Sequence, residues 1–158
     1  MSLNHTKTVS LFIQPPRGAE DAVPAIVNSA PLQVVSTVRC LGVMIDDKLT
    51  WQSHIDFIAA KVGRKIGVLR LVRRQLSQHA RRLYLQSVIM PDIEYCAVAF
   101  LSSVPAKGRK RLLSRFRWAL RAVAGANPYA DCVRIIRNLK LEPLLNQWLQ
   151  QLCSFVFV

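Results

Sequence analysis

Acidic residues are scarce in the middle of this 158-residue sequence. Between Lys61 and Arg121 the only acidic residues are Asp92 and Glu94, whereas 15 residues of the same segment are Lys or Arg. This segment carries the whole formal excess of +13, because the rest of the chain is balanced in charge. A basic block of this kind attracts polyanions, and a nucleic-acid backbone is the simplest partner. A solubilising or membrane-surface face is the plainer alternative.

The sequence also lacks a C-x-x-C pair, which argues against a structural zinc site. We expect the cysteines to be buried free thiols in a reducing compartment; they are Cys40, Cys96, Cys132 and Cys153. There is no signal-peptide pattern, and no apolar run approaches the ~18–20 residues that span a bilayer. These absences predict an intracellular protein without a membrane partner, and the sequence does not distinguish nucleus from cytoplasm.

Motifs of self-contained enzymes are missing as well: there is no G-x-S-x-G, no H-E-x-x-H and no phosphate-binding glycine loop. The three histidines do not cluster, and we expect His54 to lie on a helix surface near Asp56. The pair Asp46-Asp47 resembles the end of a polymerase aspartate motif that binds two metal ions. No tight hairpin is expected around it, so we interpret it as an acidic turn before a helix N-terminus. The sequence predicts no catalytic residue, metal site or cofactor.

The first third of the chain has strand signals. Residues 8–13, 32–35 and 40–45 are rich in β-branched and apolar side chains, whereas 15–30 contains proline, glycine and small residues typical of a loop. We expect one small antiparallel sheet here. From Thr50, a plausible N-cap, the apolar period changes to three or four residues. The predicted fold class is therefore α+β, a small antiparallel sheet followed by a mostly α-helical bundle.

Two apolar stripes define the longest predicted helices. The first stripe consists of Ile55, Ile58, Ala59, Val62, Ile66 and Leu69, and the second of Leu112, Phe116, Ala119, Leu120 and Val123. Between them, Ser77 begins a helix that Pro91 is expected to interrupt, and residues 92–101 form a further helix. Pro105 opens the second long helix and Gly125 ends it. Two final helices are expected over 128–139 and 143–158.

Ordered motifs over about residues 3–140 carry a family resemblance. Leu41-Gly42-Val43 with Ile45-Asp46 is followed by Leu49-x-Trp51-x-x-His54-Ile55. Further motifs are Asn4-x-x-Lys7-Thr8, then Tyr84, Pro91 and Tyr95-Cys96, and finally Leu112 to Arg121 with Gly125. Together they resemble the C-terminal part of the reverse transcriptases of non-LTR (LINE or jockey-like) retrotransposons. Phe100 stands where that family usually has Trp.

The resemblance implies an organisation and an activity. Residues 1–49 would be the last palm strands and the primer grip, with Leu41, Gly42 and Val43 as primer-grip-like residues, and 50–158 would be a helical thumb-like domain. The family is RNA-directed DNA polymerases, which use Mg. The region that carries the catalytic aspartates would lie upstream of this chain. We therefore expect the fragment to hold no cofactor, to be inactive alone and to have the missing polymerase region as a partner.

A thumb of this kind holds an RNA or DNA duplex through its backbone, without reading sequence. The candidate nucleic-acid-binding residues are Lys61, Arg64, Lys65, Arg73, Arg74, Arg81, Arg82, Lys107, Lys110, Arg111, Arg115, Arg117 and Arg121. A solvated charge is the plainer interpretation of each one. Two other functions stay open: a basic helical module that docks an acidic protein, and a non-functional retroelement remnant.

Overall fold

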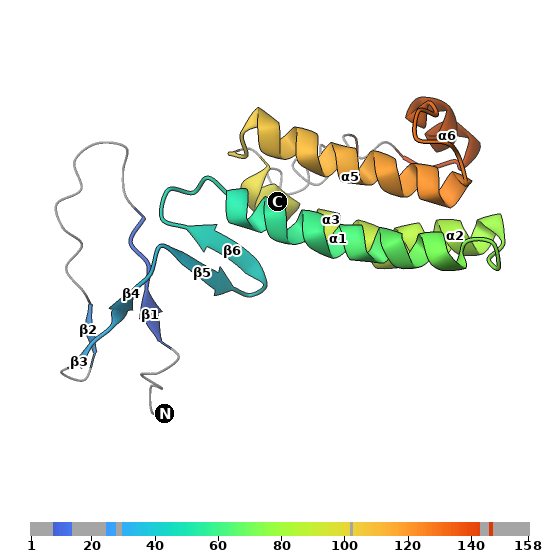
Figure 1. The fold of residues 1–158 in the computed structure, drawn as a ribbon. Coiled ribbons are helices and arrows are strands. Elements are labelled where there is room, and N and C mark those ends of the chain that lie inside the picture. The colour runs from blue at the N-terminus through green and yellow to red at the C-terminus, as the bar shows by residue number, and fades with distance from the viewer. Residues whose placement is uncertain (1–7, 14–24, 28–29, 102, 143–145, 147–158) are drawn as a thin grey trace, which may run out of the picture. The chain divides into compact units, whose positions relative to one another are not determined.

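The computed structural model describes residues 8–13, 25–27, 30–101, 103–142 and 146 of the chain. The chain divides into two units, Met1–His54 and Ile55–Val158. Figure 1 shows that the strands belong to the first unit and that helices make up the described part of the second. The predicted α+β class is confirmed. Among the described residues no helix is both long and apolar enough to cross a membrane.

Within the described residues the strands form three two-stranded sheets rather than one antiparallel sheet. β1 (Val9–Ser10) pairs in parallel with β4 (Gln33–Val34), and β2 (Ile26–Val27) pairs antiparallel with β3 (Ala30–Pro31). The second pair lies partly in the segment that we expected to be a loop. Each of these ladders is two residues long, and Pro31 has no amide hydrogen to donate to a further strand.

The third sheet is a hairpin of β5 (Thr37–Cys40) and β6 (Val43–Asp46). The expected strand over 40–45 is therefore a turn followed by a second strand. The turn residues Leu41 and Gly42 have φ values of 47° and 89°. Positive φ at both central positions is what a type I′ turn requires. Gly42 adopts it freely, but a leucine is unfavourable there because its Cβ crowds the backbone.

Three helical segments pack together in the second unit. α1 (Gln52–Val72) and α5 (Ala106–Ala124) run side by side in the same direction, and the chain between them returns through α2 (Gln78–Tyr84), η2 (Leu85–Ile89) and α3 (Met90–Glu94) (Figure 1). Both predicted apolar stripes are buried, which confirms them. The returning segment contributes Leu85, Ile89 and Ile93, all fully buried. The hydrophobic stripes therefore form the core of the bundle.

Pro91 does not interrupt the returning segment, contrary to our expectation. The chain widens instead into the π-helical turn η2, in which the amide of Met90 donates to the carbonyl of Leu85. A proline clashes with the carbonyl four residues before it in an α-helix. The wider turn is a known local adjustment of a helix, and here it lets the segment continue into α3. The interruption comes later, at Tyr95 and Cys96, because Cys96 has a φ of 55°.

The remaining helices are shorter than predicted. The helix expected over 92–101 consists of the end of α3 and of α4 (Ala97–Phe100). The helix expected over 128–139 is α6 (Cys132–Asn138), and it begins late because the side chain of Asp131 caps it by accepting from the amide of Val133 at 2.9 Å. The helix expected over 143–158 lies outside the described residues.

Candidate nucleic-acid interface

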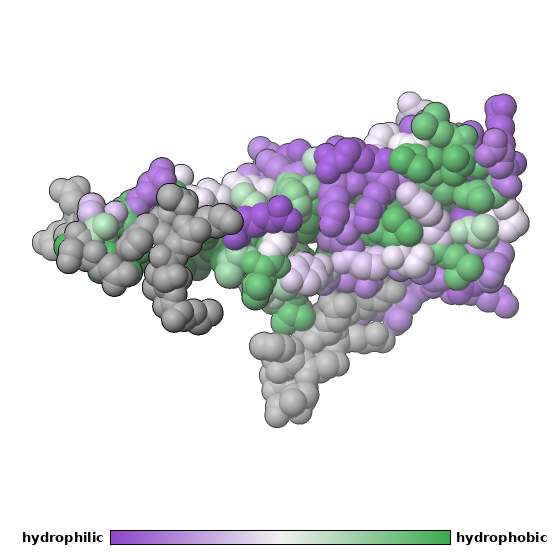
Figure 2. Space-filling view, turned by 90° about the horizontal axis from the view of Figure 1, so that it is seen from below, coloured by the Kyte–Doolittle hydropathy of each residue, from purple (hydrophilic) through white to green (hydrophobic). Residues whose placement is uncertain are grey.

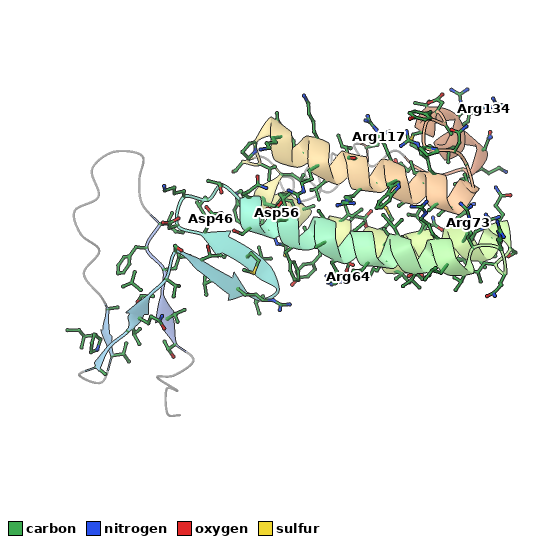
Figure 3. All side chains as sticks on the ribbon, in the orientation of Figure 1. Asp46, Asp56, Arg64, Arg73, Arg117 and Arg134 are labelled. Atoms are coloured by element: carbon green, nitrogen blue, oxygen red, sulfur yellow. The ribbon has the colours of Figure 1, made fainter. Side chains whose placement is uncertain are left out.

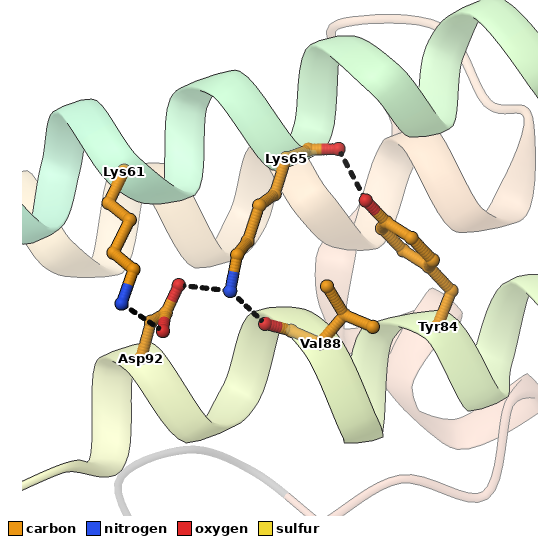
Figure 4. A network of polar contacts seen from close by, with 5 residues as sticks. All are labelled: Lys61, Lys65, Tyr84, Val88 and Asp92. Atoms are coloured by element: carbon orange, nitrogen blue, oxygen red, sulfur yellow. Dashed lines mark hydrogen bonds and ion pairs between the residues drawn. The ribbon is translucent and has the colours of Figure 1, made fainter.

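Two of the predicted cations, Lys61 and Lys65, bind the same acidic residue of the helical unit (Figure 4). Their Nζ atoms lie 2.9 Å and 2.5 Å from the carboxylate of Asp92. Lys65 also donates to the carbonyl of Val88 at 2.7 Å, and its own carbonyl accepts from the hydroxyl of Tyr84 at 3.3 Å. These contacts join α1 to the returning helical segment. They give both lysines a structural role.

Other predicted cations also have internal contacts. Arg111 pairs with Asp56 at 2.5 Å, Arg82 donates to the carbonyl of Lys140 at 3.4 Å, and Arg121 donates to the carbonyl of Ala130 at 3.2 Å. Arg81 lies beside Gly125. The Arg111 pair is nearly half exposed on both sides, and such surface pairs contribute little, about 0–1 kcal/mol. Arg111 is therefore much easier to redirect toward a ligand than Lys65.

Six predicted cations form no ion pair or side-chain hydrogen bond within the described part of the chain: Arg64, Arg73, Arg74, Lys107, Lys110 and Arg117. Figure 3 shows Arg64 pointing away from α5 and Arg117 pointing away from α1. These two side chains cannot reach the same short stretch of one ligand. The basic residues therefore form several surfaces, of which α5 carries one.

The α5 surface follows from helical spacing. Lys107, Lys110 and Arg117 are spaced by three and seven residues, which places them on one side of the helix. All three are exposed, and the buried stripe of the same helix keeps the opposite side in the core. We refer to these three residues as the α5 row. With a rise of about 1.5 Å per residue, the row extends over about 15 Å.

A groove lies where the C-terminal parts of α1 and α5 meet the loop after α5. Its volume is ≈350 Å³, and its lining includes Arg70 of α1, Arg73 of the turn after α1, Trp118 and Arg121 of α5, and residues 125–128. We call it the arginine–tryptophan groove. The guanidinium carbons of Arg70 and Arg115 lie 5.5 Å and 5.4 Å from the centre of the Trp118 ring, within cation–π range.

Local sequence rules position the wall of this groove. Gly125 has a φ of 66°, and its amide donates to the carbonyl of Ala122 while the amide of Ala126 donates to that of Arg121. This pair of bonds is a Schellman motif, which ends α5 and turns the chain sharply. The bond from Arg121 to Ala130 fixes the loop that follows. Gly125 was predicted as the end of the helix, and the structure confirms it.

Sequence reasoning missed Arg70 and Trp118. The available signal was that Trp118 lies outside the apolar stripe of α5, three residues after Arg115, where side chains of a helix are neighbours. Trp118 is 38% exposed. Trp118 therefore presents a solvent-accessible aromatic surface among arginines.

The primer-grip-like residues lie in the first unit, with Leu41 88% exposed and Val43 buried. Asp46 ends the second strand of the hairpin, opposite Thr37, and the tight turn lies at Leu41 and Gly42 rather than around the Asp46-Asp47 pair. Its two carboxylate oxygens each accept a 2.8 Å bond, from the amides of Thr50 and Trp51. Burial raises the pKa of Asp46, but these bonds outweigh burial and the net pKa is lowered. Asp46 thus supports the entry into α1.

His54 is buried, being 2% exposed, and not on the surface as we expected. Its Nδ1 accepts from the amide of Met44 at 3.4 Å, and burial lowers its pKa. The cysteines also differ from expectation, because Cys40 and Cys96 are exposed and Cys132 is half-buried. These three are free, and Cys153 lies outside the described residues. Within the described ranges no three His, Cys, Asp or Glu residues are placed to hold a metal ion.

Comparison with known proteins gives one informative similarity. A retrovirus-related Pol polyprotein from a type-1 retrotransposable element of Nasonia vitripennis is 26% identical over an alignment of 124 residues that covers 75% of this chain. The chain spans 28% of the length of that polyprotein. No protein-family model matches the chain, and no solved structure matches it. The similarity supports a retrotransposon-related protein.

Proposed function

We propose that this chain is the C-terminal part of a non-LTR retrotransposon reverse transcriptase, comprising the last palm strands, the primer grip and the thumb. Its role would be sequence-independent binding of a nucleic-acid duplex. The similarity to a Pol polyprotein supports the origin. The observation that carries the binding role is the α5 row of Lys107, Lys110 and Arg117, which are exposed cations without internal partners among the described residues.

The arrangement of charges in the α5 row is suited to binding the phosphate backbone of a nucleic acid. Cations aligned along one side of a helix contact phosphates without reading bases. Arg64 of α1 and Arg74 are also unpaired within the described residues, but Arg74 lies in the turn after α1 and does not continue a row along that helix. The α5 row is therefore the best-arranged surface for a duplex. Polymerisation would require the upstream region with its metal-binding aspartates.

Salt dependence tests the proposal. The affinity of the full chain for a labelled 20-base-pair duplex is measured by fluorescence anisotropy between 50 and 300 mM salt. Three phosphate contacts predict a slope of log K against log salt of about −2.7, since each contributes about −0.9 on B-form DNA. A flat response, or no binding at the lowest salt, would exclude the duplex-binding role.

A pair of charge-matched double variants locates the surface. Lys110→Gln with Arg117→Gln should reduce the steepness of the slope by about 1.8. Arg64→Gln with Arg74→Gln removes the same charge and should change the slope much less. Equal effects would show that net charge alone drives binding. A complex that survives heparin and unrelated duplexes would instead favour an acidic protein partner.

A further inference from the structure

The arginine–tryptophan groove combines two kinds of recognition that the α5 row lacks. Arg70, Arg73 and Arg121 converge on it, and no acidic residue lines it. Trp118 adds an aromatic ring that is partly open to solvent. A duplex backbone would use the charges but has no exposed flat face for the ring. The groove therefore suits a ligand with both a phosphate and an exposed aromatic base.

We propose that the arginine–tryptophan groove binds an unpaired nucleotide of a nucleic-acid strand, with its base against Trp118 and its phosphates on Arg70 and Arg73. The inference rests on the proposed function, because the unpaired nucleotide would belong to the same nucleic acid whose duplex binds the α5 row. It goes further, because it assigns a separate site for single-stranded nucleic acid. A duplex with a single-stranded end would then bind more tightly than the same duplex without one.

Size and chemistry support this ligand. The volume of ≈350 Å³ is at the lower end of pockets that take small molecules, about 300–1,000 Å³, so the groove fits one nucleotide rather than a helix. Arginine planes and aromatic rings are the surfaces on which proteins stack unpaired bases. Arg70 and Arg115 lie over the Trp118 ring, so a base that stacks on the ring takes the place of one guanidinium group, and the N–H groups of both arginines stay available to phosphates.

A second groove in the same unit lacks this combination. It is lined by Gln78, His79, Arg82, Asn138, Leu139 and Lys140 and has a volume of ≈310 Å³. It contains no tryptophan, tyrosine or phenylalanine. Arg82 there already donates to the carbonyl of Lys140. Its chemistry favours no particular ligand, so we assign the unpaired nucleotide to the arginine–tryptophan groove.

The experiment compares three labelled ligands on the full chain: a blunt 20-base-pair duplex, the same duplex with a five-nucleotide single-stranded overhang, and that duplex with an abasic overhang. The readout is the ratio of the overhang affinity to the blunt affinity. Stacking of an unpaired base on an aromatic ring strengthens binding, so the normal overhang should bind about tenfold tighter than the blunt duplex. The abasic overhang has the same phosphates and should show only a small gain.

Variants of Trp118 test whether its ring causes the tighter binding of the duplex with an overhang. Trp118→Ala should bring the ratio close to one, and Trp118→Phe should restore part of it. Lys110→Gln, in the α5 row, should lower both affinities and keep the ratio. The proposal is overturned if normal and abasic overhangs bind equally, or if the Trp118 variants keep the full ratio. Binding of the blunt duplex without any overhang gain rejects this inference alone, whereas failure of all three ligands to bind rejects the duplex-binding role as well.

Discussion

Lys65 and Val88 form the polar link at the point where the returning helix widens. The Nζ of Lys65 donates to the carbonyl of Val88 at 2.7 Å, inside the π-helical segment η2 (Figure 4). The same Nζ pairs with Asp92 one turn later. The widened turn that accommodates Pro91 thus has one of its carbonyls bonded by a charged donor from another helix. Lys65 stabilises an irregular backbone as well as balancing a charge.

Replacing Lys65 should therefore destabilise the protein. Lys65→Met keeps much of the aliphatic stem but removes the donor, and leaving such a partly buried carbonyl without it should cost about 1–3 kcal/mol. Lys61 would still pair with Asp92. The measurement is the free energy of unfolding in urea, followed by helical circular dichroism. The control is Arg64→Met on the neighbouring exposed position, where we expect a change within about 0.5 kcal/mol. Equal losses in both variants would contradict the structural role of Lys65.

Replacing each of two glycines in the long helices by alanine should change the stability of the protein in opposite directions. A Cβ on Gly108 would lie 2.7 Å from Cγ1 of Val104 and 3.5 Å from Ile55, whereas a Cβ on Gly67 meets no atom within 4 Å. Gly108→Ala should destabilise the bundle by about 1–3 kcal/mol through overpacking. Gly67→Ala should stabilise it by about 0.5–1 kcal/mol, because alanine favours the helix. Thermal unfolding of both variants tests this, and a shared sign would contradict the packing at Gly108.

The carboxylate of Asp46 predicts an acid-sensitive contribution to stability. In the folded state the pKa of Asp46 is lowered from 3.8. Its contribution to the free energy of unfolding is therefore present above pH 3.8 and is lost as the pH falls through the folded pKa. In Asp46→Asn, the side-chain amide group would face one of the two backbone amides that the carboxylate accepts from. The substitution should lower the free energy of unfolding by about 1–3 kcal/mol at pH 7. Urea unfolding between pH 3 and 7 measures both effects.

The neighbouring residue is the control for this change. Asp47→Asn removes the same charge, and the side chain of Asp47 has no hydrogen bond within the described residues. It should leave the free energy of unfolding within about 0.5 kcal/mol of the original. If Asp47→Asn is as destabilising as Asp46→Asn, general charge near the start of α1 explains the effect, and the two backbone bonds do not.

The helical core was predictable from the sequence because its stripes repeat with the period of one helix face, and every residue in both stripes is buried. The hairpin at Leu41 and Gly42 was not, because leucine gives no sign of positive φ. The passage through Pro91 was also missed, since it depends on a widened turn that no local rule predicts. These features are set by tertiary contacts and backbone strain, which periodicity does not encode.

The same distinction applies to the candidate site. The concentration of positive charge between Lys61 and Arg121 was evident from composition. Which cations are already committed was not, because Asp92 lies about 30 residues from the lysines that it binds. The arginine–tryptophan groove joins residues from α1 with the turn after it, from α5 and from the loop at 125–128. Only the packing of these three segments brings Arg70, Arg73 and Trp118 together.

The burial of His54 predicts a second pH dependence, at higher pH than that of Asp46. Burial lowers the pKa of His54 below 6.5 in the folded state. As the pH falls through 6.5, His54 takes up a proton in the unfolded chain before it does so in the folded one. The free energy of unfolding is therefore retained above pH 6.5 and decreases as the pH falls from 6.5 toward the lowered pKa of the folded state. Protonation of Nδ1 would also remove the acceptor for the Met44 amide. The amide resonance of Met44, followed by NMR from pH 7.5 to 5, should therefore shift with the titration of His54. In His54→Gln this shift should disappear, whereas His79→Gln, at an exposed position, should leave it unchanged. A Met44 resonance that is insensitive to pH in the original chain would mean that the buried imidazole does not accept this bond.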